Sequence, residues 1–290
     1  MDPTHRVVLF ACLSACTTSI TDEPFVDEGE PGRDLGDCGG SVEDDVPEPF
    51  ASWFRCADLV ADGGTLAVNS TSLPPHPSPY YEETDDNYVA FDDRGGDWWQ
   101  NPNTLASQDL LLRFDLEPVA KGLTITDDMV DGSAGTHDEE YRGEFQGVGL
   151  DGTALFTGVA APGDDIAEEE LTFDLYEGHP TNLGVYHHHG ANPAALAVLA
   201  YVGEVSTTVP GEAEIELYGV MCDGTFVLGC PELDGSAPDE AEFDAQNGHV
   251  GDLVDRDGTT LFAGRYHVHA CAALGRTYTP EIQYYEGQCL

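Results

Sequence analysis

Basic residues are scarce in this chain of 290 residues. Lys121 is its only lysine, and 10 lysine and arginine residues stand against 55 aspartate and glutamate residues, for a formal net charge of −45. Nucleic-acid backbones are bound through Lys and Arg that displace counterions, so this composition argues against DNA or RNA as a partner. It argues equally against docking on an anionic lipid surface. A strongly solvated surface is the simplest consequence, and a surface that collects cations is the alternative.

Catalytic and nucleotide-binding signatures are also missing. The chain has no G-x-S-x-G elbow, no P-loop, no G-x-G-x-x-G turn and no C-x-x-C pair. No apolar run is long enough to span a membrane. These absences favour a binding protein over an enzyme of a common class.

The N-terminus resembles that of an exported bacterial lipoprotein. Arg6 precedes the short apolar run Val7–Ala15, which ends in "LSAC", a stretch similar to a lipobox. This pattern predicts a signal peptide over residues 1–15 and acylation of Cys16. Because Thr17 follows, we expect an anchor in the outer membrane or at the cell surface of a Gram-negative bacterium. A plain secretory signal is the alternative.

The remaining cysteines are even in number, which in an exported chain indicates disulfides. They are Cys38, Cys56, Cys222, Cys230, Cys271 and Cys289. Six cysteines allow 15 pairings. Pairing between neighbours in sequence, 38 with 56, 222 with 230 and 271 with 289, is the preferred expectation.

Composition divides the mature chain into two parts. Residues 16–48 are rich in Asp, Glu, Gly and Pro and are expected to form a disordered tether. Residues 49–290 contain short aromatic and β-branched runs separated by turn residues, which predicts a mainly β domain, sandwich-like or barrel-like, with few short helices. Strands are expected within 110–116, 147–159, 213–221 and 224–230. Residues 166–172 suit one or two helical turns, and 194–202 suit a buried strand or a short helix.

Three sequence blocks occur twice in the same order. The copies, at about 147–190 and 219–270, contain in turn "GVGLDGTAL" and "GVMCDGTFV", "FDLYEGH" and "FDAQNGH", and "GVYHHH" and "GRYHVH". The blocks are nearly equally spaced, except for a longer loop before the last block of the second copy. Ordered recurrence of this kind indicates a tandem duplication, which we expect to fold with pseudo-twofold symmetry.

The last block of each copy repeats a Tyr-His-x-His pattern. Residues i and i+2 of a strand lie on the same face, so the outer histidines of each pattern point together. The intervening His188 points the other way and is not expected to be a ligand. A hairpin returning from each Gly-His block completes two sets of three imidazoles: His179, His187 and His189, and His249, His267 and His269. The isolated His76 and His137 lie in loop-like sequence and are expected at the surface.

Three converging imidazoles are typical of a transition-metal site. Neutral histidine is the commonest side-chain ligand, and such a set suits zinc or copper best. Asp174 and Asp244, five residues before the Gly-His histidines, are expected as fourth ligands or as acceptors that fix the imidazole tautomer. One shared site and two separate sites are both compatible with the pattern. A purely structural hydrogen-bond network is the alternative to metal binding.

The ordered blocks resemble those of the YHYH-domain family, exported proteins named for a Tyr-His-Tyr-His stretch. The resemblance covers about residues 85–289 and includes "NPNTLASQ", "GVGLDGTAL" and "TFDLYEGHPTNLGVYHHHG". His188 and Val268 stand where the family stretch has its second Tyr, and both outer histidines remain in each copy. Ala245 and Gln246 stand where the family often has cysteine, so its disulfides do not carry over. The resemblance implies an exported domain with suspected metal binding and no assigned reaction.

Taken together, the sequence predicts a lipid-anchored β domain that binds a transition metal for capture, delivery or sensing. A metal-dependent hydrolase or oxidoreductase is the second hypothesis, with metal-bound water or dioxygen as the reactant. A structural or adhesive surface module is the third. The expected partners are the metal ion and the membrane lipid, and no pattern identifies a protein partner.

Overall fold

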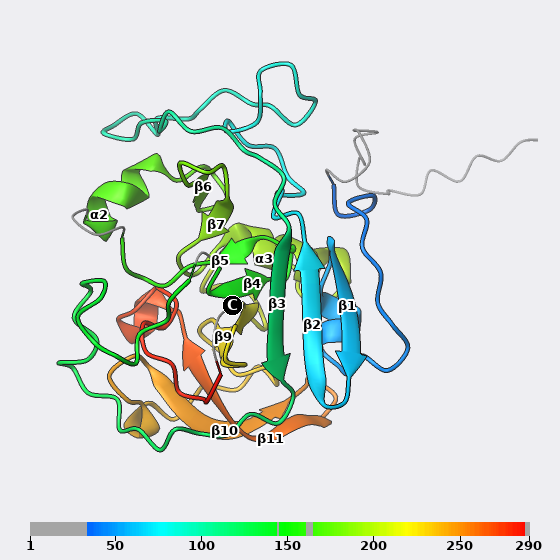
Figure 1. The fold of residues 1–290 in the computed structure, drawn as a ribbon, viewed down its shortest axis with the longest axis vertical. Coiled ribbons are helices and arrows are strands. Elements are labelled where there is room, and N and C mark those ends of the chain that lie inside the picture. The colour runs from blue at the N-terminus through cyan, green and yellow to red at the C-terminus, as the bar shows by residue number, and fades with distance from the viewer. Residues whose placement is uncertain (1–33, 144, 161–164, 288–290) are drawn as a thin grey trace, which may run out of the picture.

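The chain folds into two β-sheets with a few short helices (Figure 1). The computed structural model describes residues 34–143, 145–160 and 165–287. The first sheet contains β1 (Ala57–Asp62), β2 (Thr65–Ser70) and β3 (Leu110–Asp115). The second contains β4 (Gly147–Gly149), β5 (Ala154–Leu155), β6 (Gly178–Pro180), β7 (Tyr186–His188), β8 (Leu217–Met221), β9 (Phe226–Leu228), β10 (Gly248–Val254) and β11 (Thr260–His269). The expected mainly β class is confirmed.

Helices are short. They are α1 (Phe50–Trp53), α2 (Ile166–Glu169) and α3 (Pro193–Tyr201), with the 3₁₀ turns η1 (Glu170–Thr172), η2 (Glu240–Glu242) and η3 (Ala272–Leu274). The ambiguous segment 194–202 is therefore largely helical. The side chain of Asn192 accepts a hydrogen bond from the amide of Ala195, and Pro193 occupies the first turn. Both features start helices, which explains why this apolar run is not a strand.

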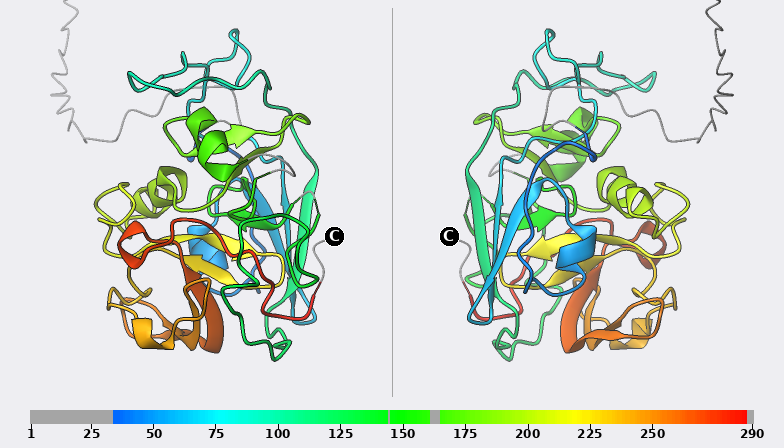
Figure 2. Two further views of the ribbon diagram at one scale, coloured as in Figure 1. Left: turned by 90° about the vertical axis from the view of Figure 1, so that its left-hand side faces the viewer. Right: turned by 90° about the vertical axis from the view of Figure 1, so that its right-hand side faces the viewer.

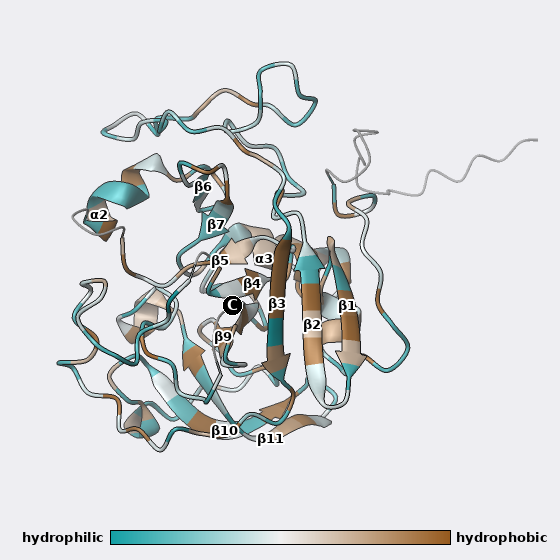
Figure 3. Cartoon of the chain, viewed as in Figure 1, coloured by the Kyte–Doolittle hydropathy of each residue, from teal (hydrophilic) through white to brown (hydrophobic). Residues whose placement is uncertain are grey.

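The first sheet has one face on the core. Its three strands are antiparallel, and β3 alternates buried and exposed residues along its length. Leu110, Leu112 and Phe114 are buried, whereas Arg113 between them is exposed. In Figure 3 the apolar colour lies along β1, β2 and β3, and hydrophilic residues dominate the long connecting loops.

The second sheet is symmetric in its strand order. Its strands run β10-β11-β9-β8-β4-β5-β7-β6, so each repeat copy contributes four consecutive strands in the same relative order. The copies meet where β4 pairs antiparallel with β8, and Val148 faces its repeat equivalent Val220. A twofold axis between these two valines exchanges the copies. The strand order thus agrees with the pseudo-twofold arrangement expected from the sequence.

The outermost strand pairs of this sheet are two hairpins. The hairpins β6–β7 and β10–β11 are each antiparallel and lie at opposite ends of the sheet (Figures 1 and 2). Each carries the Gly-His block on one strand and the Tyr-His-x-His block on the other. The fold therefore places the two histidine sets far apart in strand order.

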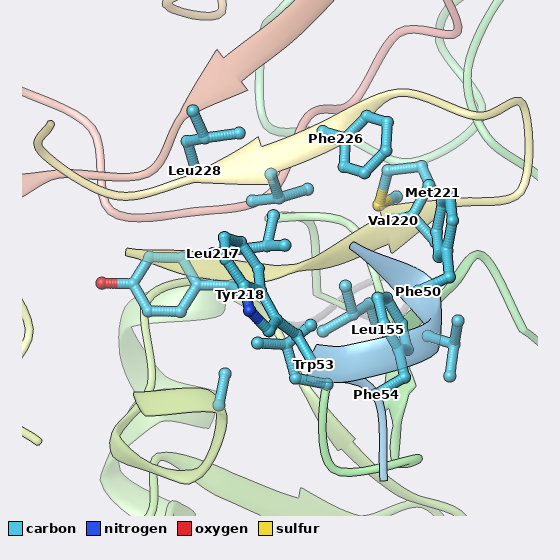
Figure 4. Packing of buried hydrophobic residues seen from close by; sticks show 14 of the residues in the cluster. Phe50, Trp53, Phe54, Leu155, Leu217, Tyr218, Val220, Met221, Phe226 and Leu228 are labelled. Atoms are coloured by element: carbon cyan, nitrogen blue, oxygen red, sulfur yellow. The ribbon is translucent and has the colours of Figure 1, made fainter. Parts of the chain in front are cut away.

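Aromatic packing joins the two sheets. Phe50 of α1 has its ring 5.6 Å from that of Phe114 in β3 and 5.5 Å from that of Phe226 in β9. Figure 4 shows Phe50 and its helix packed over the side chains of β8 and β9. Full burial of one such side chain contributes about 1.5–3 kcal/mol. These contacts join α1 to one strand of each sheet.

Part of the expected tether is ordered. Residues 34–48 pack on the domain: Val42 bridges to Leu59 of β1, Val46 is buried, and Cys38 is disulfide-bonded to Cys56. The expectation of disorder was wrong for this part, because the disulfide and the bridge fix a polar segment that has little apolar surface of its own. Residues 1–15, with the predicted signal peptide, and Cys16 lie outside the described residues.

Disulfide pairing follows the sheet rather than the sequence. Cys38–Cys56 is confirmed, but Cys230 pairs with Cys271, so the expected 222–230 and 271–289 pairs were wrong. Parallel pairing of β9 with β11 sets Leu228 opposite His269, and each cysteine lies two residues beyond. Cys222 is also disulfide-bonded, and Cys289 lies outside the described residues. These bonds indicate an oxidising compartment outside the cytoplasm. Within the described ranges, no helix combines the length and apolar character needed to cross a membrane.

Candidate metal centres

Hairpin register brings the predicted histidines together. In the first copy His179 lies directly opposite His187, and in the second copy His249 lies directly opposite His267. The second histidine of each Tyr-His-x-His block follows on the same face. All six imidazoles are buried.

The repeated residues around the histidines have one structural role each. The Phe173 ring stacks on His189, as Phe243 stacks on His269. Gly178 precedes the first histidine because a Cβ there would collide with the ring of Tyr186. A β-carbon at the equivalent glycine of the second copy would collide with its tyrosine in the same way. The sequence pattern Phe-Asp…Gly-His…Tyr-His-x-His is therefore one packed unit, made twice.

Asp174 and Asp244 occupy the same position in the two copies, and each binds the tyrosine of its hairpin, not the imidazoles. The Asp174 carboxylate accepts hydrogen bonds from the Tyr186 hydroxyl at 2.9 and 3.0 Å, and Asp244 accepts one from Tyr266 at 2.6 Å. Both tyrosines lie on the opposite strand face from the imidazole sets. The expectation that these aspartates are ligands or hold the imidazole tautomer was wrong, because the loops before β6 and β10 carry them to the tyrosine side of each hairpin.

The first centre consists of Glu169, His179, His187 and His189. The Nε2 atom of His187 lies 3.1 Å from Nε2 of His179 and 3.0 Å from Nε2 of His189. The Glu169 carboxylate is 3.3 Å from Nε2 of His179. Four ligand atoms at about 2.0–2.1 Å from a tetrahedral zinc lie about 3.3 Å apart, so this spacing matches a metal site.

Hydrogen bonds fix the tautomer of two imidazoles in the first centre. Nδ1 of His187 donates to the carbonyl of Val185 at 3.1 Å, and Nδ1 of His189 donates to the carbonyl of Thr157 at 2.6 Å. A ring with its proton on Nδ1 has a bare lone pair on Nε2, so the Nε2 lone pairs of these two rings face each other. Nδ1 of His179 contacts the Thr172 hydroxyl at 2.6 Å and the donating amide of Asn101 at 3.4 Å, so this ring has partners in either tautomer.

Burial favours the neutral form of these rings. Desolvation, together with the neighbouring histidines, holds the pKa of His187 well below its usual range. Desolvation and the nearby His179 likewise lower the pKa of His189 to about 4. Neutral imidazole is the form that binds metal ions.

The second centre consists of Glu232, His249, His267 and His269. Its carboxylate reaches all three rings, at 3.1 Å from Nε2 of His249, 3.1 Å from Nε2 of His267 and 3.5 Å from Nε2 of His269. Nδ1 of His267 donates to the carbonyl of Arg265, and Nδ1 of His269 donates to the carbonyl of Gly229. Burial raises the pKa of Glu232, but the three histidines beside its carboxylate outweigh burial and lower that pKa overall.

No sequence pattern points to either glutamate. By block alignment Glu169 corresponds to Asp239, so Glu232 is not its repeat equivalent, and the duplication gave no signal for either. The chain also has 55 acidic residues among which to choose. One signal pointed to Glu232: it lies two residues after Cys230, which is bonded to Cys271 beside His269. That signal is useful only once the disulfide pairing is known.

The first centre lines a large cavity. The cavity has a volume of about 990 Å³, and its wall includes His179, His187, His189, Trp99 and Arg142. Five acidic side chains outnumber Arg142 on this wall, so its charge is negative overall. The cavity gives the first centre a route for a ligand.

The other histidines also have defined places. His188 is buried on the far face of β7, as strand alternation predicted, but it lies 3.7 Å from Asp151. His76 was expected at the surface and is instead buried, with its ring stacked on Tyr176. That expectation was wrong because the long loop before β3 returns to the sheet. His137 is half-buried.

The six predicted histidines thus form two separate groups, each with a glutamate, whose atoms have the spacing of a metal site. The resemblance to the YHYH-domain family remains a prediction. No family model matches the chain, and no curated protein or solved structure is significantly similar to it.

Proposed function

We propose that the protein binds transition-metal ions in the first and second centres. The observation that carries this proposal is the set of three Nε2 atoms facing one another in the first centre at 3.0 and 3.1 Å. The Nδ1 protons of His187 and His189 are already committed to backbone carbonyls, so the Nε2 lone pairs of these rings face each other. Lone pairs at this distance repel unless a cation lies between them.

A proton serves this arrangement less well than a metal ion. One proton bridges only one pair of nitrogens, whereas His187 faces both His179 and His189. Protonation is also opposed by the burial that lowers the pKa of His187 and His189. A divalent ion binds all three nitrogens and the Glu169 oxygen together. Imidazole-rich sets with one carboxylate suit zinc and copper among the available ions.

The surroundings of the two centres favour different uses. Glu232 contacts every imidazole of the second centre, which gives a closed set of four donors like that of a structural site. The first centre lines the 990 Å³ cavity. We infer that exchange for capture, delivery or sensing occurs at the first centre, and that the second holds its ion tightly.

Elemental analysis of variants tests the proposal. The full chain is purified without a metal-affinity resin, because such a resin loads histidines. His187→Ala and His267→Ala should each lose one equivalent of metal, and the double variant should lose two. The control His137→Ala removes a histidine outside both centres and should keep the full content. Equal metal content in the wild type and all four variants would contradict the proposal and favour a structural or adhesive module.

Metal removal gives a second readout. Chelation should lower the thermal unfolding midpoint, because an ion that binds only the folded state stabilises it. The shift should be smaller in each single variant and disappear in the double variant. A midpoint that ignores chelator in the wild-type protein would indicate that the imidazoles only bridge strands.

The cavity supports one second candidate, a metal-dependent hydrolase or oxidoreductase that acts at the first centre. Its chemistry needs a coordination position open to a reactant. Azide added to the copper-loaded protein should then produce a charge-transfer absorption band that His187→Ala abolishes and His267→Ala keeps. A spectrum indifferent to azide would count against an enzyme.

We also propose that the chain is exported, acylated on Cys16 and anchored to the outer membrane, as a member of the YHYH-domain family. The "LSAC" stretch and the paired Tyr-His-x-His blocks support this. Mass spectrometry of the native N-terminus tests the anchor: a diacylglyceryl group on Cys16 is expected, and an unmodified N-terminus at another residue would contradict it.

A further inference from the structure

Behind the first centre, on the opposite face of β7, lies a third cluster formed by His76, Asp151 and His188. Nε2 of His188 and Oδ2 of Asp151 are 3.7 Å apart, and both side chains are only 1% exposed. Nε2 of His76 completes the group, and the three atoms all lie within 4.8 Å of one another. Among the described residues, none of these three atoms has a hydrogen-bond partner.

All three atoms are acceptors. Nδ1 of His188 donates to the carbonyl of Glu177 at 2.9 Å, and Nδ1 of His76 donates to the carbonyl of Pro77 at 3.1 Å. Each neutral ring therefore has a bare lone pair on Nε2. Two lone pairs and a carboxylate oxygen then meet in the protein interior with no donor between them. Burial lowers the pKa of His188, but the Asp151 carboxylate outweighs it and raises that pKa overall, so the cluster attracts a positive charge. Unpaired buried acceptors of this kind are rare and costly.

The second repeat copy shows how the same position looks without such a cluster. Asp223 is the equivalent of Asp151, and its carboxylate accepts hydrogen bonds from the Tyr141 hydroxyl and from the backbone amides of Tyr284 and Tyr285. Val268 stands where the first copy has His188. The aspartate alone is thus satisfied by the fold. At Asp151 the first copy supplies one imidazole, His188, and the loop before β3 supplies the other, His76, while the Oδ2 atom of Asp151 has no hydrogen-bond partner among the described residues.

We propose that His76, Asp151 and His188 bind a divalent transition-metal ion at a buried third site. Two neutral imidazoles and one carboxylate are a donor set for zinc or ferrous iron. The charge also fits, because the Asp174 carboxylate acts electrostatically on both His76 and His188, so two carboxylates oppose the two positive charges of the ion.

The site is a cross-link between distant segments. His76 comes from the long loop before β3, Asp151 from the turn between β4 and β5, and His188 from β7. The stacking of His76 on Tyr176 at 3.7 Å already aligns its ring. Because the site is buried, the ion enters during folding and exchanges slowly.

Zinc retention after refolding tests this site apart from the other two. The full-length chain is unfolded in denaturant with chelator, refolded with excess zinc, freed of unbound metal and analysed for zinc. His188→Val copies the residue of the second repeat, and His76→Phe keeps an aromatic ring on Tyr176 while removing both nitrogens. Each variant should retain one zinc fewer than the wild type. If His188→Val does not refold, the zinc content of His76→Phe decides the test.

The background variant His187→Ala/His267→Ala separates this proposal from the proposed function. There one zinc should remain, and adding His76→Phe should remove it. If the first and second centres bind nothing, the wild type still exceeds His76→Phe by one zinc. Equal zinc in the wild type, His188→Val and His76→Phe would overturn the third site and assign a water molecule or a proton to the cluster.

Discussion

Each imidazole of the first centre has one nitrogen held by the protein and one directed at its neighbours. Two of the three acceptors are repeated as well as the rings: Val185 is equivalent to Arg265, and Thr157 is equivalent to Gly229. Acceptors on Nδ1 orient a ring and raise its basicity as a ligand. Nδ1 of His249 has no hydrogen-bond partner among the described residues, so the two copies share the supporting contacts of the Tyr-His-x-His block and not that of the Gly-His histidine.

The tyrosine of each Tyr-His-x-His block supports the hairpin from behind. Tyr186→Phe should lower the free energy of unfolding by about 1–3 kcal/mol, because the buried Asp174 carboxylate loses a hydrogen-bond donor. Metal content should not change, since the hydroxyl lies on the other face of the strand. Urea unfolding and elemental analysis measure the two effects. Tyr201→Phe, at an exposed tyrosine of α3, is the control and should stay within about 0.5 kcal/mol.

Metal-free protein should lose stability as the pH falls below about 6.5. The pKa of His189 is about 4 in the folded chain and about 6.5 when unfolded, so between these values only the unfolded state binds its proton. Each such group changes the free energy of unfolding by up to about 1.4 kcal/mol per pH unit. Urea unfolding of the chelated protein between pH 7 and 5.5 measures the slope, which His189→Gln should make shallower. A slope unaffected by that variant would contradict the assignment.

At the scale of elements, the Cys230–Cys271 disulfide ties the second centre together. Cys230 lies two residues before Glu232, and Cys271 lies two residues after His269. The first centre has no counterpart, because Gly158 and Ala191 stand at the equivalent positions. The bond therefore joins the segment of the carboxylate ligand to the strand of the imidazoles.

Cys230→Ala/Cys271→Ala should weaken metal binding at the second centre by roughly tenfold or more, the scale expected when support of a ligand is lost. Titration against a chromophoric chelator in the His187→Ala background measures this centre without the first. Cys38→Ala/Cys56→Ala removes a disulfide distant in sequence from either centre and is the matched control. Equal weakening by both pairs would mean a general loss of stability, not a local effect.

The site residues that could be predicted from the sequence lie on or next to regular strands. Strand alternation and the doubled blocks were enough to group the six histidines and to turn His188 away from them. Glu232 and His76 lie in irregular segments, and Glu169 ends the four-residue helix α2. No periodic pattern determines where such short or irregular segments lie relative to the hairpins. The Cys230–Cys271 bond depends on the parallel pairing of β9 with β11, which sequence spacing does not reveal.

At the scale of the whole molecule, the net charge of −45 opposes compaction. Sodium chloride should raise the thermal midpoint, because the screening length falls from about 10 Å at 0.1 M to about 3 Å at 1 M salt. Each kcal/mol of repulsion removed should shift the midpoint by roughly 2–4 °C. Potassium chloride should act alike if the effect is screening. A midpoint independent of salt would show that the surface charges are already compensated.

The same charge surrounds both centres with a field that attracts cations, so a metal-binding role agrees with the composition as well as with the local geometry. Anomalous diffraction at the metal absorption edge, from crystals of untagged protein purified without metal-affinity resin, tests this role most directly. We predict one peak about 2.0–2.1 Å from the Nε2 atom of His187 and another at the same distance from the Nε2 atom of His267. Featureless anomalous maps at both hairpins would contradict the account.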